Sequence, residues 1–260
     1  MKKISTVLLS TIVVLSLSNT NVHASSLDQE NVKNKETAPI NEQNTDYLNN
    51  SQGEEVLNLI DAISTEVEKE VPNEPALTEA YKLELKDRIM AQLNTIEQQK
   101  KNEENIMSTF GLGLTSTKVV KIYQSNLDLA KTIYNIFLDT KREDGTVAAN
   151  TYRLTIFYEL VKTGGYWDLK QELGTKNKYQ FKDTNKTGEY IGNHHYGYMG
   201  RALGFSNTVL KAAAGMYQIK SETSDWKFIS SYFDDPADQK AINSGVTDYN
   251  NGYRFTLVIA

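Results

Sequence analysis

The amino-acid sequence predicts a mainly α fold with a small β component. An N-terminal helical region precedes a compact helical domain that is rich in glycine and aromatic residues. Apolar residues recur at three- and four-residue steps from residue 54 to about residue 163, and capping residues interrupt that pattern where helices are expected to end. A β-branched and aromatic run over residues 253–259 predicts one terminal strand. The chain has no cysteine, so an ordinary hydrophobic core must stabilise it.

The first 24 residues have the composition of a secretory signal peptide. Lys2 and Lys3 precede an apolar segment at 7–17, and residues 22–24 resemble a cleavage site. The apolar segment is short and is interrupted by polar residues, which argues against a stable membrane anchor. We therefore predict a secreted, extracellular protein from which residues 1–24 have been removed.

The next segments predict a linker followed by helices. Residues 25–53 are polar and have few large apolar side chains, which is typical of a disordered linker. The periodicity of the N-terminal helical region, residues 54–140, divides it into helices over 54–71, 76–104 and 118–138.

We place the glycine- and aromatic-rich domain at residues 150–260. Its first helix spans residues 151–163 and precedes two glycines. Ser206 is expected to cap a helix that runs to about residue 219. A further helix begins after Asp235 and is expected to end at Gly245.

The stretch 188–205 holds the only two histidines outside the predicted signal peptide, His194 and His195. Gly192, Gly197, Gly200 and Gly204 lie there among tyrosines and a phenylalanine. Because glycine costs backbone entropy, this density predicts special backbone angles or close approach to a ligand. The alternative is a tight turn around a packed aromatic cluster.

Charge is uneven along the chain. Residues 25–162 carry 15 basic and 23 acidic side chains, whereas residues 163–260 carry 11 basic and 10 acidic ones. Neither part has the basic excess of a protein held to nucleic acid by phosphate contacts. A small nuclease pocket is compatible with this composition.

A histidine beside a carboxylate can act as a general acid or base near neutral pH. We predict that His195 pairs with Asp168 or Asp234 in this way, while Lys170 or Arg201 stabilises an anionic transition state. The alternative is that one histidine is packed in the core and the other is exposed.

A divalent cation is a second possibility for the acidic cluster. Asp234 and Asp238 are candidate oxygen ligands for calcium or magnesium. Helix capping also explains acids at this place, and for Asp235 we favour capping.

Three sequence blocks follow one another in the C-terminal part of the chain: GGYWDLK at 164–170, GNHHYGYMGRALGF at 192–205 and DDPADQKAINSG at 234–245. Together, and in this order, they resemble the bacterial polymorphic toxin type 44 domain family. The resemblance covers about residues 150–250. Its polar matches are Asp168, Lys170, Asn193, Tyr196, Asp234, Asp235, Asp238 and Gln239.

The resemblance implies an enzymatic toxin of interbacterial competition, with nuclease activity a common expectation for such modules, and a cognate immunity protein as its partner. We therefore predict a secreted toxin-like hydrolase, an RNase that uses His and Asp acid–base chemistry, with Asn193 and Asp238 among its catalytic residues. Two alternatives stay open. One is a hydrolase of the cell wall or of a lipid-linked precursor outside the cytoplasm, and the other is a non-enzymatic secreted binding protein.

Overall fold

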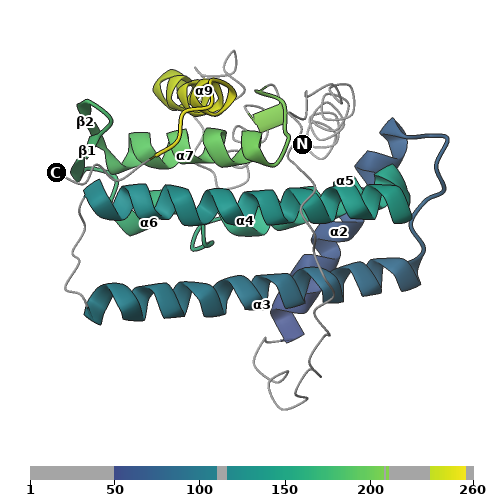
Figure 1. Cartoon of the computed structure of the whole chain (residues 1–260). Coiled ribbons are helices and arrows are strands. Elements are labelled where there is room, and N and C mark those ends of the chain that lie inside the picture. The colour runs from purple at the N-terminus through teal and green to yellow at the C-terminus, as the bar shows by residue number, and fades with distance from the viewer. Residues whose placement is uncertain (1–49, 110–115, 208, 211–234, 256–260) are drawn as a thin grey trace, which may run out of the picture.

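A computed structural model describes residues 50–109, 116–207, 209–210 and 235–255 (Figure 1). The predicted fold class is confirmed: the described chain is mainly α-helical with one two-stranded antiparallel sheet. In chain order the elements are α2 (Asn50–Glu70), α3 (Glu79–Thr109), α4 (Ser116–Glu143), α5 (Gly145–Val161), α6 (Leu169–Leu173), β1 (Lys178–Phe181), β2 (Thr184–Thr187), α7 (Gly188–Ala202) and α9 (Pro236–Asn250).

Capping residues begin the two helices that matter most for the site. The Thr187 side chain accepts a hydrogen bond from the backbone N–H of Tyr190 at the start of α7. Asp235 accepts one from Ala237 N–H at 2.7 Å and precedes Pro236, as the sequence predicted for α9. The predicted end of that helix is wrong, because α9 continues past Gly245 to Asn250.

Two other expectations fall partly outside the described residues. The Ser206 hydroxyl accepts a hydrogen bond from Val209 N–H, which agrees with its predicted capping role, but residues 211–234 are not described. Residues 253–255 are not in a strand, and residues 256–260 lie outside the described chain.

The helix α7 lies between α9 on one side and α4 on the other (Figure 1). The short helix α6 and the hairpin of β1 and β2 pack against one end of α7. On the other side of the molecule, α2 packs on α5 and α3. The histidine-bearing helix is therefore covered from two sides.

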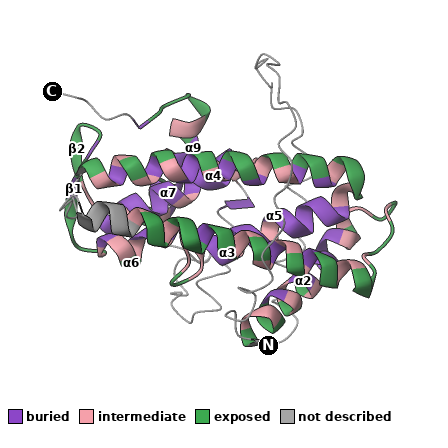
Figure 2. Cartoon of the chain, turned by 60° about the horizontal axis from the view of Figure 1, so that its bottom comes forward, coloured by how far each residue is buried: buried purple, intermediate pink, exposed green. Residues whose placement is uncertain are grey.

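Buried side chains from α2 through Phe255 form one large hydrophobic cluster (Figure 2). Its members include Ile60 of α2, Ile133 of α4 and Met199 of α7, each with no exposed surface. The predicted N-terminal helical region ends at residue 140, inside α4, and the predicted glycine-rich domain begins at residue 150, inside α5. Within the described ranges, no helix has the length and apolar character needed to cross a membrane.

Candidate functional site

The two histidines lie in the regular helix α7, and Gly204 beyond its end has the positive φ of 82° that a turn requires. Within α7, Gly197 instead gives room to a neighbouring backbone. A Cβ on Gly197 of α7 would collide with the carbonyl oxygen of Ile242 in α9. A Cβ on Gly245 of α9 would collide with the carbonyl oxygen of His194. The two helices therefore touch backbone to backbone, and this contact sets α9 beside the α7 histidine.

His194 is hydrogen-bonded at both ring nitrogens. Its Nε2 lies 2.8 Å from Oδ2 of Asp248 on α9, and its Nδ1 lies 2.9 Å from the hydroxyl of Tyr123 on α4. The ring has no exposed surface, whereas the side chain of Asp248 is 14% exposed. The imidazole thus connects a buried hydroxyl to a carboxylate that reaches solvent.

The charge at this site lies on Asp248 and Lys182. Burial lowers the pKa of His194 below its ordinary value, although the neighbouring carboxylate opposes that shift. Burial acts to raise the pKa of Asp248, but hydrogen bonds from His194 and from the ammonium of Lys182 outweigh burial and lower it. At neutral pH we therefore assign an ionised Asp248 and a neutral His194 that donates its Nε2–H to the carboxylate.

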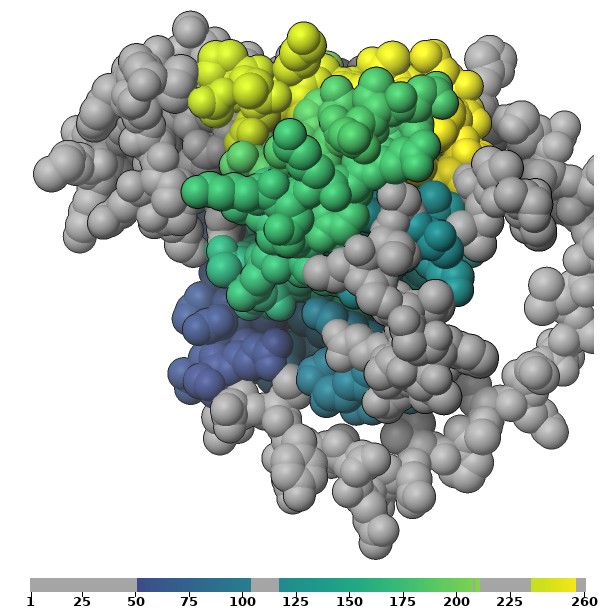
Figure 3. Space-filling model, turned by 90° about the vertical axis from the view of Figure 1, so that its left-hand side faces the viewer, coloured from purple at the N-terminus to yellow at the C-terminus, as the bar shows by residue number. Residues whose placement is uncertain are grey.

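Three cation–aromatic pairs involve the hairpin, the start of α7 and the end of α9, and the cation of one pair, Lys182, also bonds Asp248. Lys182 lies 4.3 Å from the ring centre of Tyr253, Lys186 lies 4.5 Å from that of Tyr190, and the guanidinium of Arg254 lies 5.5 Å from that of Tyr249. We call these six residues the cation–tyrosine surface. Figure 3 faces this end of the molecule, where the hairpin and α7 (green) meet the end of α9 (yellow).

His195 has a different environment. Its Nε2 lies 3.0 Å from the side-chain amide nitrogen of Asn126, and its ring packs edge-on against Tyr123 and Trp167. It has no exposed surface, and burial, with the nearby His194, lowers its pKa to about 3. His195 is therefore a neutral group inside the core at physiological pH.

Three of the predicted catalytic residues come together near α6. Asp168 caps this helix and accepts hydrogen bonds from the backbone N–H groups of Gly164 and Gln171. Lys170 forms an ion pair with Asp238 of α9 at 3.4 Å. The bond from Gln171 caps α6 and the bond from Gly164 closes the preceding turn, and neither joins Asp168 to a histidine.

Asn193 and Arg201 lie further along α7. Asn193 is 6% exposed, and its side-chain nitrogen has no hydrogen-bond partner among the described residues. Arg201 donates hydrogen bonds to the side chain of Asn250 and to the carbonyl of Phe205, so it joins the ends of α7 and α9. The catalytic roles predicted for these residues stay predictions.

The cation ligands predicted for the acidic cluster are not tested, because Asp234 lies outside the described residues. Among the residues that are described, no group of three or more histidine or acidic side chains is arranged to hold a metal ion. Asp238 is engaged with Lys170, and Asp235 caps α9.

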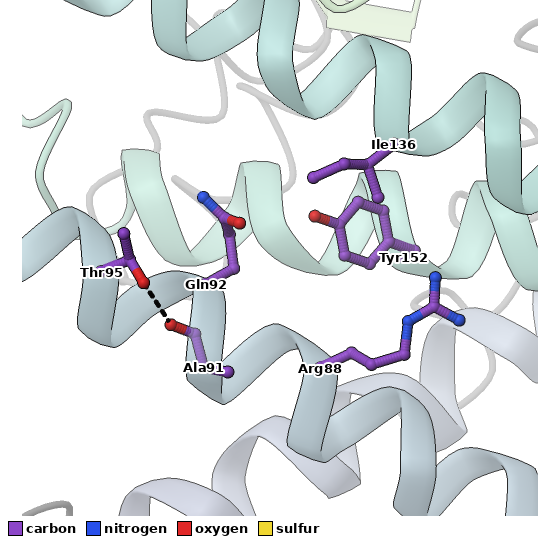
Figure 4. Close-up of a pocket in the computed structure, with 6 residues that line it drawn as sticks. All are labelled: Arg88, Ala91, Gln92, Thr95, Ile136 and Tyr152. Carbon is purple, nitrogen blue, oxygen red and sulfur yellow. Dashed lines mark hydrogen bonds between the residues drawn. The ribbon is translucent and has the colours of Figure 1, made fainter. Parts of the chain in front are cut away.

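A pocket of about 300 Å³ lies in the N-terminal half, between α3, α4 and α5 (Figure 4). None of the predicted site residues lines it. The lining residues are Arg88, Ala91, Gln92, Thr95, Ile136 and Tyr152. The guanidinium of Arg88 is already bonded to Thr140 and Asp144.

Sequence reasoning missed the partners of the histidines. Tyr123 belongs to an apolar stripe that is typical of a core face, and only its hydroxyl distinguishes it from that core. Asp248 lies in the last turn of α9, beyond the predicted end of the helix. The continued helical spacing after Gly245 was the available signal, since a helix through residue 250 places position 248 one turn beyond that glycine.

Comparison with known proteins returned one family. The family model described as bacterial toxin 44 matches residues 156–251, which include all three sequence blocks. No curated protein and no solved structure matches the chain. The C-terminal part of the chain therefore matches the bacterial toxin 44 family, as the three blocks predicted.

Proposed function

We propose that this toxin domain is a hydrolase, specifically an RNase, in which Asp248 and His194 form the acid–base pair. The contact of 2.8 Å between His194 Nε2 and Asp248 Oδ2, with Lys182 on the same carboxylate, carries the proposal. A carboxylate at the surface with a histidine behind it suits proton transfer, whereas a fully buried group cannot touch a substrate. Both histidine rings are buried, but only His194 is bonded to a carboxylate that reaches solvent, so we favour His194 over His195.

In the proposed reaction, Asp248 accepts the proton of a ribose 2′-hydroxyl while that oxygen attacks the phosphorus. The bond from phosphorus to the 5′-oxygen breaks, and the leaving oxygen takes a proton from water. The ammonium of Lys182 stabilises the negative charge that grows on the phosphate oxygens. The Nε2–H of His194 holds the carboxylate in place. Proton transfer to a positioned general base such as Asp248 contributes about 10²- to 10⁴-fold in rate.

The cation–tyrosine surface supports nucleic acid as the substrate. Single-stranded nucleic acid binds where cationic groups contact its backbone and aromatic rings stack on its bases. Tyr253 is 36% exposed, and the Lys182 ammonium lies over its ring. Lys182 therefore joins this surface to the proposed catalytic carboxylate.

Secretion and an immunity protein complete the proposal. The signal-peptide composition of residues 1–24 supports export. An RNase made inside a cell endangers the producer before export, so we expect a cognate immunity protein that covers Asp248 or the cation–tyrosine surface.

The test is expression of two forms in a bacterium, one without residues 1–24 and one intact, with growth and RNA integrity scored after induction. We expect the form without residues 1–24 to stop growth and degrade RNA. Lysis with the intact form alone would replace the RNase by a cell-envelope hydrolase. If neither form has an effect, the binding-protein alternative is favoured.

A further inference from the structure

The helix α4 contacts both histidines, although it lies outside the segment that matches the toxin family. It ends at Glu143, and the match begins at residue 156. It packs against α7 on the side away from α9 (Figure 1). Lys118 at its start forms an ion pair of 2.8 Å with Glu172 of α6. The matched segment is thus held by a helix that the match does not include.

Two side chains of α4 reach the histidines from one helix face. Tyr123 and Asn126 are three residues apart, which places them one above the other. The Tyr123 hydroxyl lies 2.9 Å from His194 Nδ1, and the Asn126 amide nitrogen lies 3.0 Å from His195 Nε2. Both α4 side chains are almost completely buried.

The Tyr123 hydroxyl lies within hydrogen-bond distance of two acceptors, His194 Nδ1 at 2.9 Å and the carbonyl oxygen of Ile191 at 3.2 Å. Burial keeps the pKa of this hydroxyl well above its ordinary value, so it remains a donor. The ionised carboxylate of Asp248 accepts from Nε2, so the neutral imidazole keeps its proton on that nitrogen. Its Nδ1 then accepts from the Tyr123 hydroxyl, for which it is a nearer acceptor than the Ile191 carbonyl. The Tyr123 ring is fixed in turn, with its centre 4.0 Å from that of Phe255.

We infer that α4 completes the candidate site, and that Tyr123 is a positioning residue that holds His194 in its Nε2–H tautomer toward Asp248. The role in activity rests on the proposed function, whereas the tautomer does not. Tyr123 adds no group that touches a substrate. It acts through His194, as the outer hydrogen-bond partner of a functional histidine does.

The test compares the full chain with its Tyr123→Phe and Tyr134→Phe variants. Tyr134 lies on the same helix, stacks on Phe137 and is only partly buried, so it controls for loss of a tyrosine hydroxyl from α4. Imidazole ¹⁵N NMR assigns the protonated nitrogen of His194 in each form. Hydrolysis of single-stranded RNA gives kcat and KM, and thermal unfolding reports stability.

In the parent chain and in Tyr134→Phe we expect His194 protonated at Nε2, with Nδ1 as a hydrogen-bond acceptor. In Tyr123→Phe the Nδ1 signal should move to that of an unbonded nitrogen, and kcat should fall by about 10- to 100-fold with KM unchanged. A parent chain with the proton on Nδ1 would overturn the inference, and this outcome does not depend on how the variant folds. An unchanged Nδ1 signal or full activity in Tyr123→Phe would also overturn it.

These outcomes separate the inference from the proposed function. If the proposed function is wrong, either the parent chain does not hydrolyse RNA or a His194→Gln variant keeps the parent's activity, while the NMR result for Tyr123 still decides the tautomer. If only the inference is wrong, His194→Gln loses activity and Tyr123→Phe does not.

Discussion

The two adjacent histidines of α7 have the same burial and opposite surroundings. Neither has any exposed surface. His194 has a hydrogen-bond partner at each nitrogen, and one partner is a carboxylate at the surface. His195 is bonded to the neutral amide of Asn126 at one nitrogen and is enclosed by rings, while its Nδ1 has no partner among the described residues.

This difference shows that burial alone does not decide what a histidine does. A buried imidazole can exchange a proton with a substrate only through a group that reaches solvent, and Asp248 gives His194 such a route. His195 has a polar neighbour but no charged one on its ring, so it is suited to packing. In the proposed function, the side of α7 that faces α9 therefore carries the chemistry, and the side with His195 has a structural role.

Substitution of Asp248 should have the largest effect on activity, because it removes the carboxylate that distinguishes His194 from His195. Asp248→Asn keeps the size of the side chain and removes the charge that pairs with Lys182 and accepts from His194. We expect RNA hydrolysis to fall about 10²- to 10⁴-fold, the usual contribution of a general acid or base. Asp128→Asn is the matched control, since Asp128 is exposed and forms only a surface pair with Lys131. Equal activity of the two variants would remove Asp248 from the reaction.

The pH dependence of the free energy of unfolding tests whether His195 is a neutral core residue. The pKa of His195 is about 3 in the folded chain, below its unfolded value near 6.5. The unfolded state therefore binds the proton more strongly, so this contribution to stability is complete above about pH 6.5 and is lost progressively as the pH falls toward 3. Between pH 7.5 and pH 5 one such histidine lowers the free energy of unfolding by about 2 kcal/mol.

We expect His195→Gln to lose less unfolding free energy than the parent between pH 7.5 and pH 5, by about the 2 kcal/mol assigned to this histidine. Urea unfolding of parent and variant at both pH values measures this. Glutamine does not titrate in this range, so the curve of the variant should be flatter. The same pH dependence in parent and variant would mean that His195 is not a neutral core residue.

The close contact between α7 and α9 predicts that substitution of Gly245 lowers the free energy of unfolding by a similar or smaller amount. A Cβ on Gly245 would collide with the carbonyl oxygen of His194, so Gly245→Ala should destabilise the fold by about 1–3 kcal/mol through overpacking. Gly53 of α2 has no atom within 4 Å of such a Cβ, and Gly53→Ala should stabilise the chain by about 0.5–1 kcal/mol. Thermal unfolding measures both. A neutral Gly245→Ala would show that the two backbones do not touch.

Local signals predicted much of the fold. Periodicity located α2, α3 and α4 within a few residues, and Asp235 with Pro236 located the start of α9. The same reasoning failed at Gly245, because a glycine that ends a helix and a glycine that admits a neighbouring backbone look alike in sequence. For the glycines of α7 the sequence predicted special backbone angles or a close approach to a ligand. In the structure, Gly197 allows the close approach of another helix.

The candidate site was less accessible to sequence reasoning, because its contacts are distant along the chain. Tyr123 lies 71 residues from His194, and Asp248 lies 54 residues from it. Periodicity reports which face of a helix is apolar, but it does not report which helix covers that face. The sequence indicated that the histidine pair is a candidate site. It did not indicate which of the two rings has a carboxylate partner, because that depends on where α4 and α9 pack against α7.

The most direct test is hydrolysis of single-stranded RNA by the purified full chain, with His194→Gln and His195→Gln measured in parallel at equal folded fraction. We predict that His194→Gln loses about 10²- to 10⁴-fold in kcat, as expected for loss of the acid–base pair. His195→Gln should retain activity within about tenfold, since a packed residue acts on stability rather than on the reaction. A large loss in His195→Gln together with full activity in His194→Gln would contradict the account.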